Sequence, residues 1–134
     1  MMNLDQARGF LKKEFPQNTV EIDEIGCGWA VVRQEIGFAH LRPGNTVSGP
    51  TMMTVADCGA YVAILGQLGE IALAVTTNLN INFLRKPESD KAIIGRCQVL
   101  KAGKRLVICE IRLYSEGGDE PVAHATATYS IPPK

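Results

Sequence analysis

The 134-residue chain carries no excess of charge of either sign, because 14 Lys and Arg residues balance 14 Asp and Glu residues. A balanced chain offers no global electrostatic attraction to nucleic acid or to a membrane surface, so we expect neither partner. The N-terminal residues lack the apolar run of a signal peptide, and no stretch is interpreted as long and apolar enough to span a bilayer. These absences predict a cytoplasmic protein.

Cysteines are few and scattered. The four of them include no C-x-x-C pair, and three lie in apolar or alternating runs, where a free thiol packs as a small hydrophobic group. We therefore predict no metal site and no disulfide framework. The chain also lacks repeats, linkers and low-complexity segments, and its length suits one domain, residues 1–134, that can bury a core.

The most informative stretch is T-V-S-G-P-T-M-M-T-V-A-D-C-G-A-Y-V-A-I-L-G, residues 46–66. It predicts a helix of about four turns from Pro50, with Ser48 as a possible N-cap and Gly66 or Gly69 as the stop signal. The segment has almost no polar face, which is typical of a helix buried on all sides. At this length it is too short to cross a membrane, so other elements must wrap it.

Asp57 interrupts this apolar pattern, being the only charged residue between Arg42 and Glu70. An ionised carboxylate inside an apolar helix costs several kcal/mol unless it is paired or faces water. Two interpretations follow. Asp57 either lies at a wet edge or hydrogen-bonds a neighbouring loop, or it is a catalytic carboxylate.

The rest of the chain has one further helix pattern, at residues 4–15, which Pro16 ends. Trp29 is interpreted as a packing anchor, and a loop over residues 36–45 contains His40. Residues 75–83 alternate, with every second side chain expected on one apolar face. The strand patterns are residues 19–25, 29–35, 73–84, 91–102, 104–114 and 121–131.

Together these patterns predict an α+β fold. An antiparallel sheet of five to six strands would wrap around the one long buried helix, with the short N-terminal helix added. Such a sheet leaves an edge strand unpaired, so we expect pairing with a second copy of the chain.

Three motifs carry a family resemblance. S-G-P-T-M-M-T-V-A-D-C-G-A-Y stands where the family has H-G-G followed, eight residues after its middle Gly, by an acidic residue. V-T-T-N-L-N-I-N-F-L-R-K-P is similar to its T-x-x-L-x-I-x-F-L-R-P strand, and V-L-K-A-G-K-R-L-V-I-C-E-I to its long hairpin with a Gly-Lys or Gly-Arg turn. The chain thus resembles the hotdog-fold acyl-CoA thioesterases of the PaaI-like, phenylacetate-degradation type.

The resemblance implies roles for three residues. Asp57 matches the catalytic carboxylate, as general base or as nucleophile. Gly49 matches the glycine whose N–H binds the thioester oxygen at the helix N-terminus. Thr76 matches the hydroxyl residue that the opposite subunit contributes near the attacking water.

The chain also departs from the family motif. Ser48-Gly49-Pro50 replaces His-Gly-Gly, so the imidazole is absent and Pro50 lacks the N–H of a second glycine. Gly49 alone must then be the main-chain donor. Some members carry an Asn shortly before the glycines, and Asn45 or His40 could substitute for it here.

The resemblance places four basic residues where family members bind coenzyme A: Arg85, Lys86, Lys104 and Arg105. The alternative for these four is an ordinary solvated turn. No cofactor is implied beyond coenzyme A as part of the substrate.

The working hypothesis is therefore hydrolysis of acyl-CoA thioesters by a homodimer or a dimer of dimers. The acyl group would lie against Met52, Met53 and Tyr61, unless these are plain core. Two alternatives stay open. One is a hotdog hydratase, which would pair an acidic residue with His40 or His124, and the other is an acyl-CoA-binding module without turnover.

Overall fold

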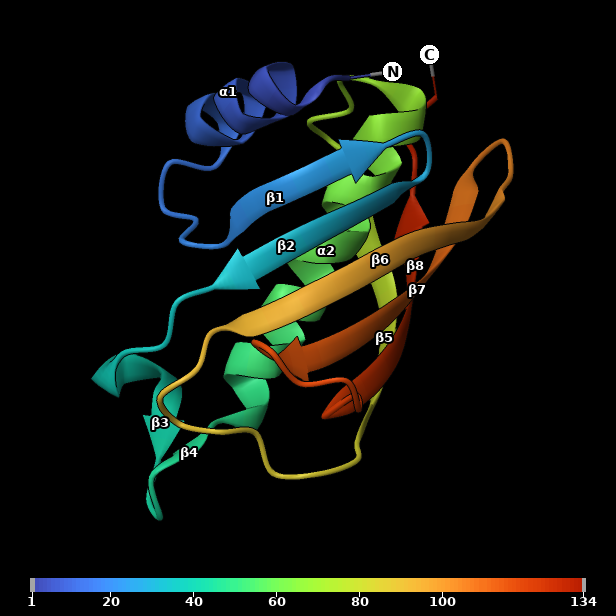
Figure 1. The fold of residues 1–134 in the computed structure, drawn as a ribbon. Helices are drawn as coiled ribbons and strands as arrows, with labels where there is room; N and C mark the ends of the chain where they lie inside the picture. Colours follow the sequence, from blue (N-terminus) through green and yellow to red (C-terminus); the bar gives the residue numbers. More distant parts are fainter. Residues whose placement is uncertain (1, 134) are drawn as a thin grey trace.

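The structure is a computed structural model that describes residues 2–133. One antiparallel sheet curves around a central helix, α2 (Gly49–Leu68), as Figure 1 shows. Its six strands run in the order β1-β2-β6-β7-β8-β5, which confirms the predicted hotdog fold. The strands are β1 (Glu21–Gly26), β2 (Trp29–Gln34), β5 (Val75–Phe83), β6 (Ile93–Ala102), β7 (Leu106–Ser115) and β8 (Ala123–Ser130).

The N-terminal helix α1 (Leu4–Glu14) begins with a capping box, in which Asn3 and Gln6 each accept a hydrogen bond from the other's backbone N–H. Its buried side chains are Ala7, Phe10 and Leu11, at helical spacing. The helix packs beside β1 and the end of α2, as predicted for an amphipathic element.

Helix α2 is longer than the predicted four turns. Ser48 is its N-cap and accepts a hydrogen bond from the Thr51 N–H, and the helix ends at Gly69, whose φ of 83° suits glycine. Gly66 is no stop signal. It is buried inside the helix, where any side chain would collide with the carbonyl oxygen of Gly26 in β1. Gly66 therefore allows close packing between helix and sheet.

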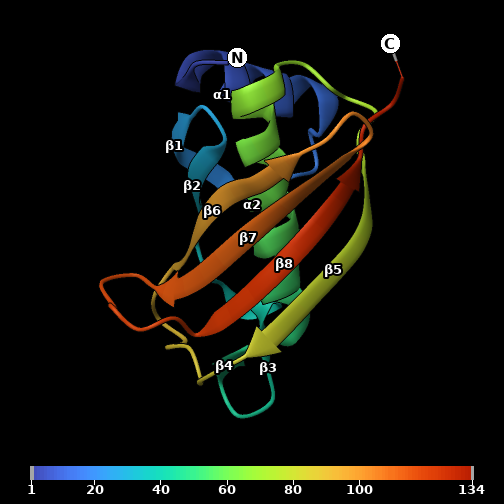
Figure 2. The same cartoon turned by 90° about the vertical axis from the view of Figure 1, so that its right-hand side faces the viewer.

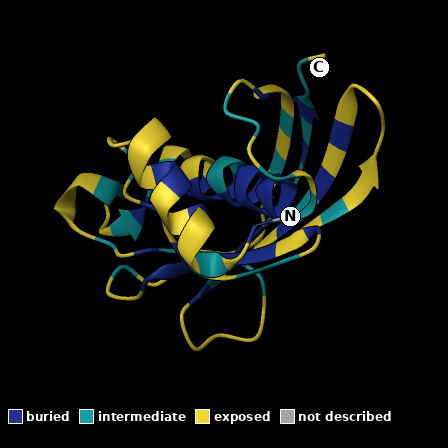
Figure 3. Ribbon diagram, turned by 90° about the horizontal axis from the view of Figure 1, so that it is seen from above, coloured by how far each residue is buried: buried dark blue, intermediate teal, exposed yellow. Residues whose placement is uncertain are grey.

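The added length corrects one expectation. At 20 residues, α2 is long and apolar enough to cross a membrane by length and composition, although no such stretch was predicted. Most of the helix is buried inside the fold, as in the core helix of a soluble protein. Figure 3 shows these buried positions enclosed by the surrounding elements.

The inner face of the sheet supplies the packing surface for α2. In β8 every second residue is buried, namely Ala123, Ala125, Ala127 and Tyr129, and β7 alternates in the same way. Figure 2 shows β6, β7, β8 and β5 side by side, with α2 behind them. The alanine side chains project only a short way from that part of β8, whereas the side chain of Tyr129 is large.

A β-bulge in β5 changes which side chains face the helix. Thr76 lies opposite Tyr129 and Asn78 lies opposite Thr128, so Thr77 is the extra residue between them. The bulge turns Thr76 toward the inner face, on the same side as Leu79. The predicted unbroken alternation over residues 75–83 is therefore wrong at this point.

Two smaller expectations also change. The loop before α2 contains a 3₁₀ turn, η1 (Phe38–His40), and a hairpin of β3 (Leu41–Arg42) and β4 (Thr46–Val47), which are too short to leave a sequence pattern. Trp29 is 42% exposed and lies against Gly26, so it covers a turn rather than anchoring the core.

Candidate active site

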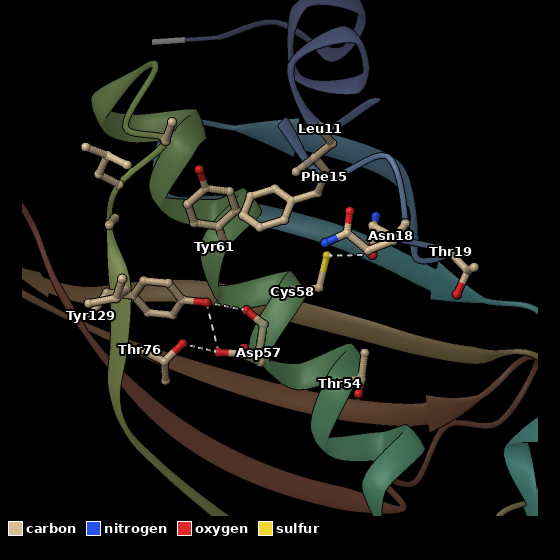
Figure 4. A pocket seen from close by; sticks show the side chains of 15 residues that line it. Leu11, Phe15, Asn18, Thr19, Thr54, Asp57, Cys58, Tyr61, Thr76 and Tyr129 are labelled. Atoms are coloured by element: carbon tan, nitrogen blue, oxygen red, sulfur yellow. Dashed lines mark hydrogen bonds between the residues drawn. The ribbon is translucent and has the colours of Figure 1, made fainter. Parts of the chain in front are cut away.

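Asp57 lies on the side of α2 that faces β5 and β8, and two hydroxyl groups from these strands hold its carboxylate. The Thr76 Oγ1–H donates to Oδ1 at 2.6 Å. The Tyr129 hydroxyl lies 2.8 Å from the same Oδ1 and 3.0 Å from the Asp57 carbonyl oxygen. Figure 4 shows the three side chains converging from α2, β5 and β8. The negative charge of Asp57 in the apolar helix is thus stabilised by hydrogen bonds from the Thr76 and Tyr129 hydroxyl groups.

The titratable neighbours of Asp57 stay protonated at neutral pH. Burial raises the pKa of the Tyr129 phenol above its usual value, and the Asp57 charge raises it further. Burial likewise raises the pKa of the Cys58 thiol to about 12, with a smaller contribution from Asp57. Cys58 is therefore an inert thiol, and Tyr129 remains a hydrogen-bond donor.

The carboxylate faces a cavity of about 580 Å³. The cavity lies between α2, the end of α1, residues 17–19 and the segment entering β5. Phe15 packs edge-on against Tyr61 with ring centroids 5.6 Å apart, and Tyr61 stacks on Tyr129 at 5.9 Å. The lining is mainly aromatic and aliphatic, and Asp57 is the only acidic residue in it. Such a cavity suits an apolar group placed beside a carboxylate.

The N-terminus of α2 is the second polar feature. Ser48 caps the Thr51 N–H, and Pro50 has no N–H. Among residues 2–133, no hydrogen bond to the Gly49 N–H is found. This N–H is therefore free to bind an oxygen that develops negative charge. Phe83 from the end of β5 packs against Gly49.

Comparisons with known proteins identify the family of the chain. The model of the thioesterase superfamily matches residues 44–122, which is more than half of the chain. The chain belongs to the thioesterase superfamily. The matched segment begins just before α2 and includes Gly49, Asp57 and Thr76.

Solved structures show the same relationship. A putative thioesterase from Silicibacter sp. TM1040 is 44% identical, with a TM-score of 0.91 over 99% of this chain and 94% of that one. The zebrafish thioesterase superfamily member 2 is 19% identical, with a TM-score of 0.86 over 98% and 100%. The Escherichia coli PaaI protein from the phenylacetic acid degradation operon is 20% identical, with a TM-score of 0.75 over 94% and 90%. The last two likenesses show the shared fold. No curated protein sequence matches the chain.

Within the thioesterase fold, Thr76 is placed differently from the expectation. It was expected to reach the site from the opposite subunit, but it contacts Asp57 of its own chain. The bulge in β5 is the physical reason, because it turns Thr76 inward toward α2.

Sequence reasoning missed Tyr129. The only signal was one large hydroxyl-bearing residue at an inward position of β8, where the other inward residues are alanines. Pattern alone could not connect it to Asp57, because the two residues are 72 positions apart in the chain.

Asn45 and His40 do not line the Asp57 cavity of their own chain. Asn45 sits at the tip of the β3–β4 hairpin with a φ of 57°, and its amide donates to Ser89 Oγ at 3.1 Å. The His40 Nδ1 accepts the Gly37 N–H at 2.8 Å, and the His40 carbonyl accepts the Ser48 N–H. In this structure His40 thus supports the entry to α2.

The four basic residues form two separate pairs. Arg85 and Lys86 follow the end of β5, and Arg85 donates to the Pro121 carbonyl at 2.6 Å. Lys104 and Arg105 lie in the β6–β7 turn, at the opposite end of the sheet. One chain therefore does not gather them into a single phosphate site.

His124 lies on the outer face of β8, where its Nε2 is 2.9 Å from Glu110 Oε2. Asp57 lies on the inner side of the sheet, so neither histidine pairs with it in the described chain. Within the described residues of one chain, the structure therefore shows no acid–histidine pair in the cavity, of the kind that the hydratase alternative requires. Of the expected acyl contacts, Tyr61 lines the cavity, Met52 is core and Met53 is 40% exposed.

Proposed function

We propose that this thioesterase hydrolyses acyl-CoA thioesters to the free acid and coenzyme A. The observation that supports the proposal is the Asp57 carboxylate, held by Thr76 and Tyr129 at the wall of an apolar cavity of about 580 Å³. The cavity would receive the acyl group and place its thioester near the carboxylate. The mainly apolar lining favours an apolar acyl tail, with room for an aromatic or branched one.

In the reaction we propose, Asp57 removes a proton from water as the water oxygen bonds to the thioester carbonyl carbon. The tetrahedral intermediate collapses, the carbon–sulfur bond breaks, and the coenzyme A thiolate takes up the proton. Alternatively, Asp57 attacks the carbonyl carbon itself and forms an anhydride that water then hydrolyses. In both routes a main-chain N–H stabilises the oxyanion.

The oxyanion donor would come from a second copy of the chain. Gly49 and Asp57 are eight residues apart in one helix, which at 1.5 Å per residue places them about 12 Å apart. That separation is too long for one carbonyl group to meet both. A two-fold dimer with antiparallel helices would bring Gly49 of one copy beside Asp57 of the other.

Two exposed features support this homodimer. Strand β5 is an edge of the sheet and has no neighbour on its outer side among the described residues. The apolar side chains of Met53, Val75, Phe83 and Leu84 near it are 40% to 58% exposed. Pairing of the β5 strands of two copies would cover both the unpaired strand edge and these apolar side chains. We propose further that two such dimers associate into a dimer of dimers.

Coenzyme A would bind across the same dimer. If two β5 strands pair antiparallel, the Arg85 end of one chain lies at the same end of the joined sheet as the Lys104–Arg105 turn of the second copy. The two basic pairs would then face one nucleotide. The protein needs no other cofactor in this mechanism.

The test is thiol release from short, medium, long and aromatic acyl-CoA esters by wild type, Asp57→Asn and Asp119→Asn. The last variant removes an exposed carboxylate in the β7–β8 turn and is the matched control. We expect wild-type activity that falls about a hundredfold or more in Asp57→Asn alone, the scale for loss of a general base.

Two results would contradict the proposal. One is wild-type activity that survives in Asp57→Asn. The other is a folded protein that binds acyl-CoA but releases no thiol from any ester, which would favour the binding module.

A further inference from the structure

Tyr129 contacts Asp57 but lies outside the three sequence motifs that carry the family resemblance. Its side chain is 4% exposed, and its hydroxyl lies 2.8 Å from Asp57 Oδ1 and 3.0 Å from the Asp57 carbonyl oxygen. A phenol has one proton, so the two acceptors share it. The residue is thus tied to both the side chain and the backbone of Asp57.

The two hydroxyl contacts distinguish the carboxylate oxygens. Thr76 and Tyr129 both donate to Oδ1, and within residues 2–133 no hydrogen bond to Oδ2 is found. Oδ2 is therefore the atom left for water or substrate. Because the donors come from two different strands, rotation of the carboxylate would break both bonds at once.

We propose that Tyr129 is a positioning residue for Asp57, which holds Oδ1 so that Oδ2 faces the reacting thioester. This inference rests on the proposed thioesterase function. Tyr129 acts through Asp57 and needs no contact with the substrate. Its stacking on Tyr61 fixes the ring, so that the hydroxyl approaches from a constant direction.

The phenol serves this role over a wide pH range. Burial and the Asp57 charge raise its pKa above the usual value, so the phenol stays protonated at neutral pH and above. The other titratable groups that face Asp57 are Cys58 and Tyr61 on its own helix. The segments from α1, residues 17–19 and the entry to β5 present no charged side chain to the cavity.

The kinetic test compares Tyr129→Phe with wild type and with Tyr114→Phe, a matched change on β7 outside the cavity. We expect kcat to fall about ten- to hundredfold in Tyr129→Phe, the effect of losing a hydrogen bond to a charged group, with KM little changed.

A second measurement does not need activity or a folded Tyr129→Phe variant. With ¹³Cζ-labelled tyrosine, the three tyrosines should give three resonances: Tyr61→Phe and Tyr114→Phe assign two of them, and the third belongs to Tyr129 by elimination. We expect Asp57→Asn to shift the Tyr129 resonance and to leave that of Tyr114 in place.

The outcomes separate the two proposals. An unchanged Tyr129 resonance in Asp57→Asn, or wild-type kcat in a folded Tyr129→Phe, would overturn the positioning role while leaving the thioesterase intact. Failure of wild type to hydrolyse any ester would instead overturn the thioesterase, and with it the positioning role, even where the resonance shift shows the contact.

Discussion

Thr76 and Asp57 are joined by a hydrogen bond of 2.6 Å between Oγ1 and Oδ1, within one chain and across the gap between β5 and α2. The bond exists because the β-bulge at Thr77 turns Thr76 inward. The bulge in the edge strand β5 thus supplies one of the two hydroxyl donors to the candidate catalytic carboxylate.

Replacing Thr76 by Val should lower kcat about tenfold, since it removes one donor to the carboxylate at nearly constant side-chain volume. Steady-state hydrolysis of the best acyl-CoA ester measures this. Thr77→Val is the matched control, because Thr77 donates to the Thr128 carbonyl instead. Equal loss in both variants would point to strand β5 as a whole rather than to the Thr76 hydroxyl.

Two inactive variants should complement each other if the site is shared between subunits. Asp57→Asn removes the base, and Gly49→Pro removes the N–H at a helix position that accepts proline. Each mixed dimer would contain one intact site out of two, so purified heterodimers should show about half of the wild-type activity per dimer. The measurement is thiol release by doubly tagged, purified heterodimers compared with each parent. No recovery in verified heterodimers would place both groups in one chain's site.

Shortening Phe15 should change the preference for the acyl group. Phe15→Ala removes the ring that packs on Tyr61 at the α1 side of the cavity, so bulkier acyl tails should gain in kcat/KM relative to short ones. Competition between two esters measures the ratio directly. Phe38→Ala, at a residue that is 93% exposed, should leave it unchanged. An unaltered ratio in Phe15→Ala would mean that the acyl group binds elsewhere.

Two Gly→Ala variants in different helices should change stability in opposite directions. Gly66→Ala places a methyl group against the Gly26 carbonyl and should lower the free energy of unfolding by about 2 kcal/mol or more. Gly9→Ala in α1 meets no atom within 4 Å and should raise it by about 0.5–1 kcal/mol through helix propensity. Urea unfolding followed by circular dichroism measures both. A neutral Gly66→Ala would show that the helix can move away from β1.

Local pattern was enough for the two α-helices, for the six strands of the main sheet and for the prominence of Asp57. A charge inside an apolar helix, caps such as Ser48, and alternating strands all act between near neighbours, so they can be recognised without a fold. The apolar helix also required a sheet to cover it, from which the architecture followed.

The surroundings of Asp57 depended on contacts that only the folded chain creates. Tyr129 lies 72 residues from Asp57, and its approach depends on strand order and register. Thr76 faces the helix because one bulge shifts the side-chain period, which strict alternation cannot anticipate. Gly66 was interpreted as a stop signal because its packing partner, the Gly26 carbonyl, belongs to another element. Long-range packing therefore decided the surroundings of the carboxylate, whereas short-range chemistry had already indicated where the carboxylate would be.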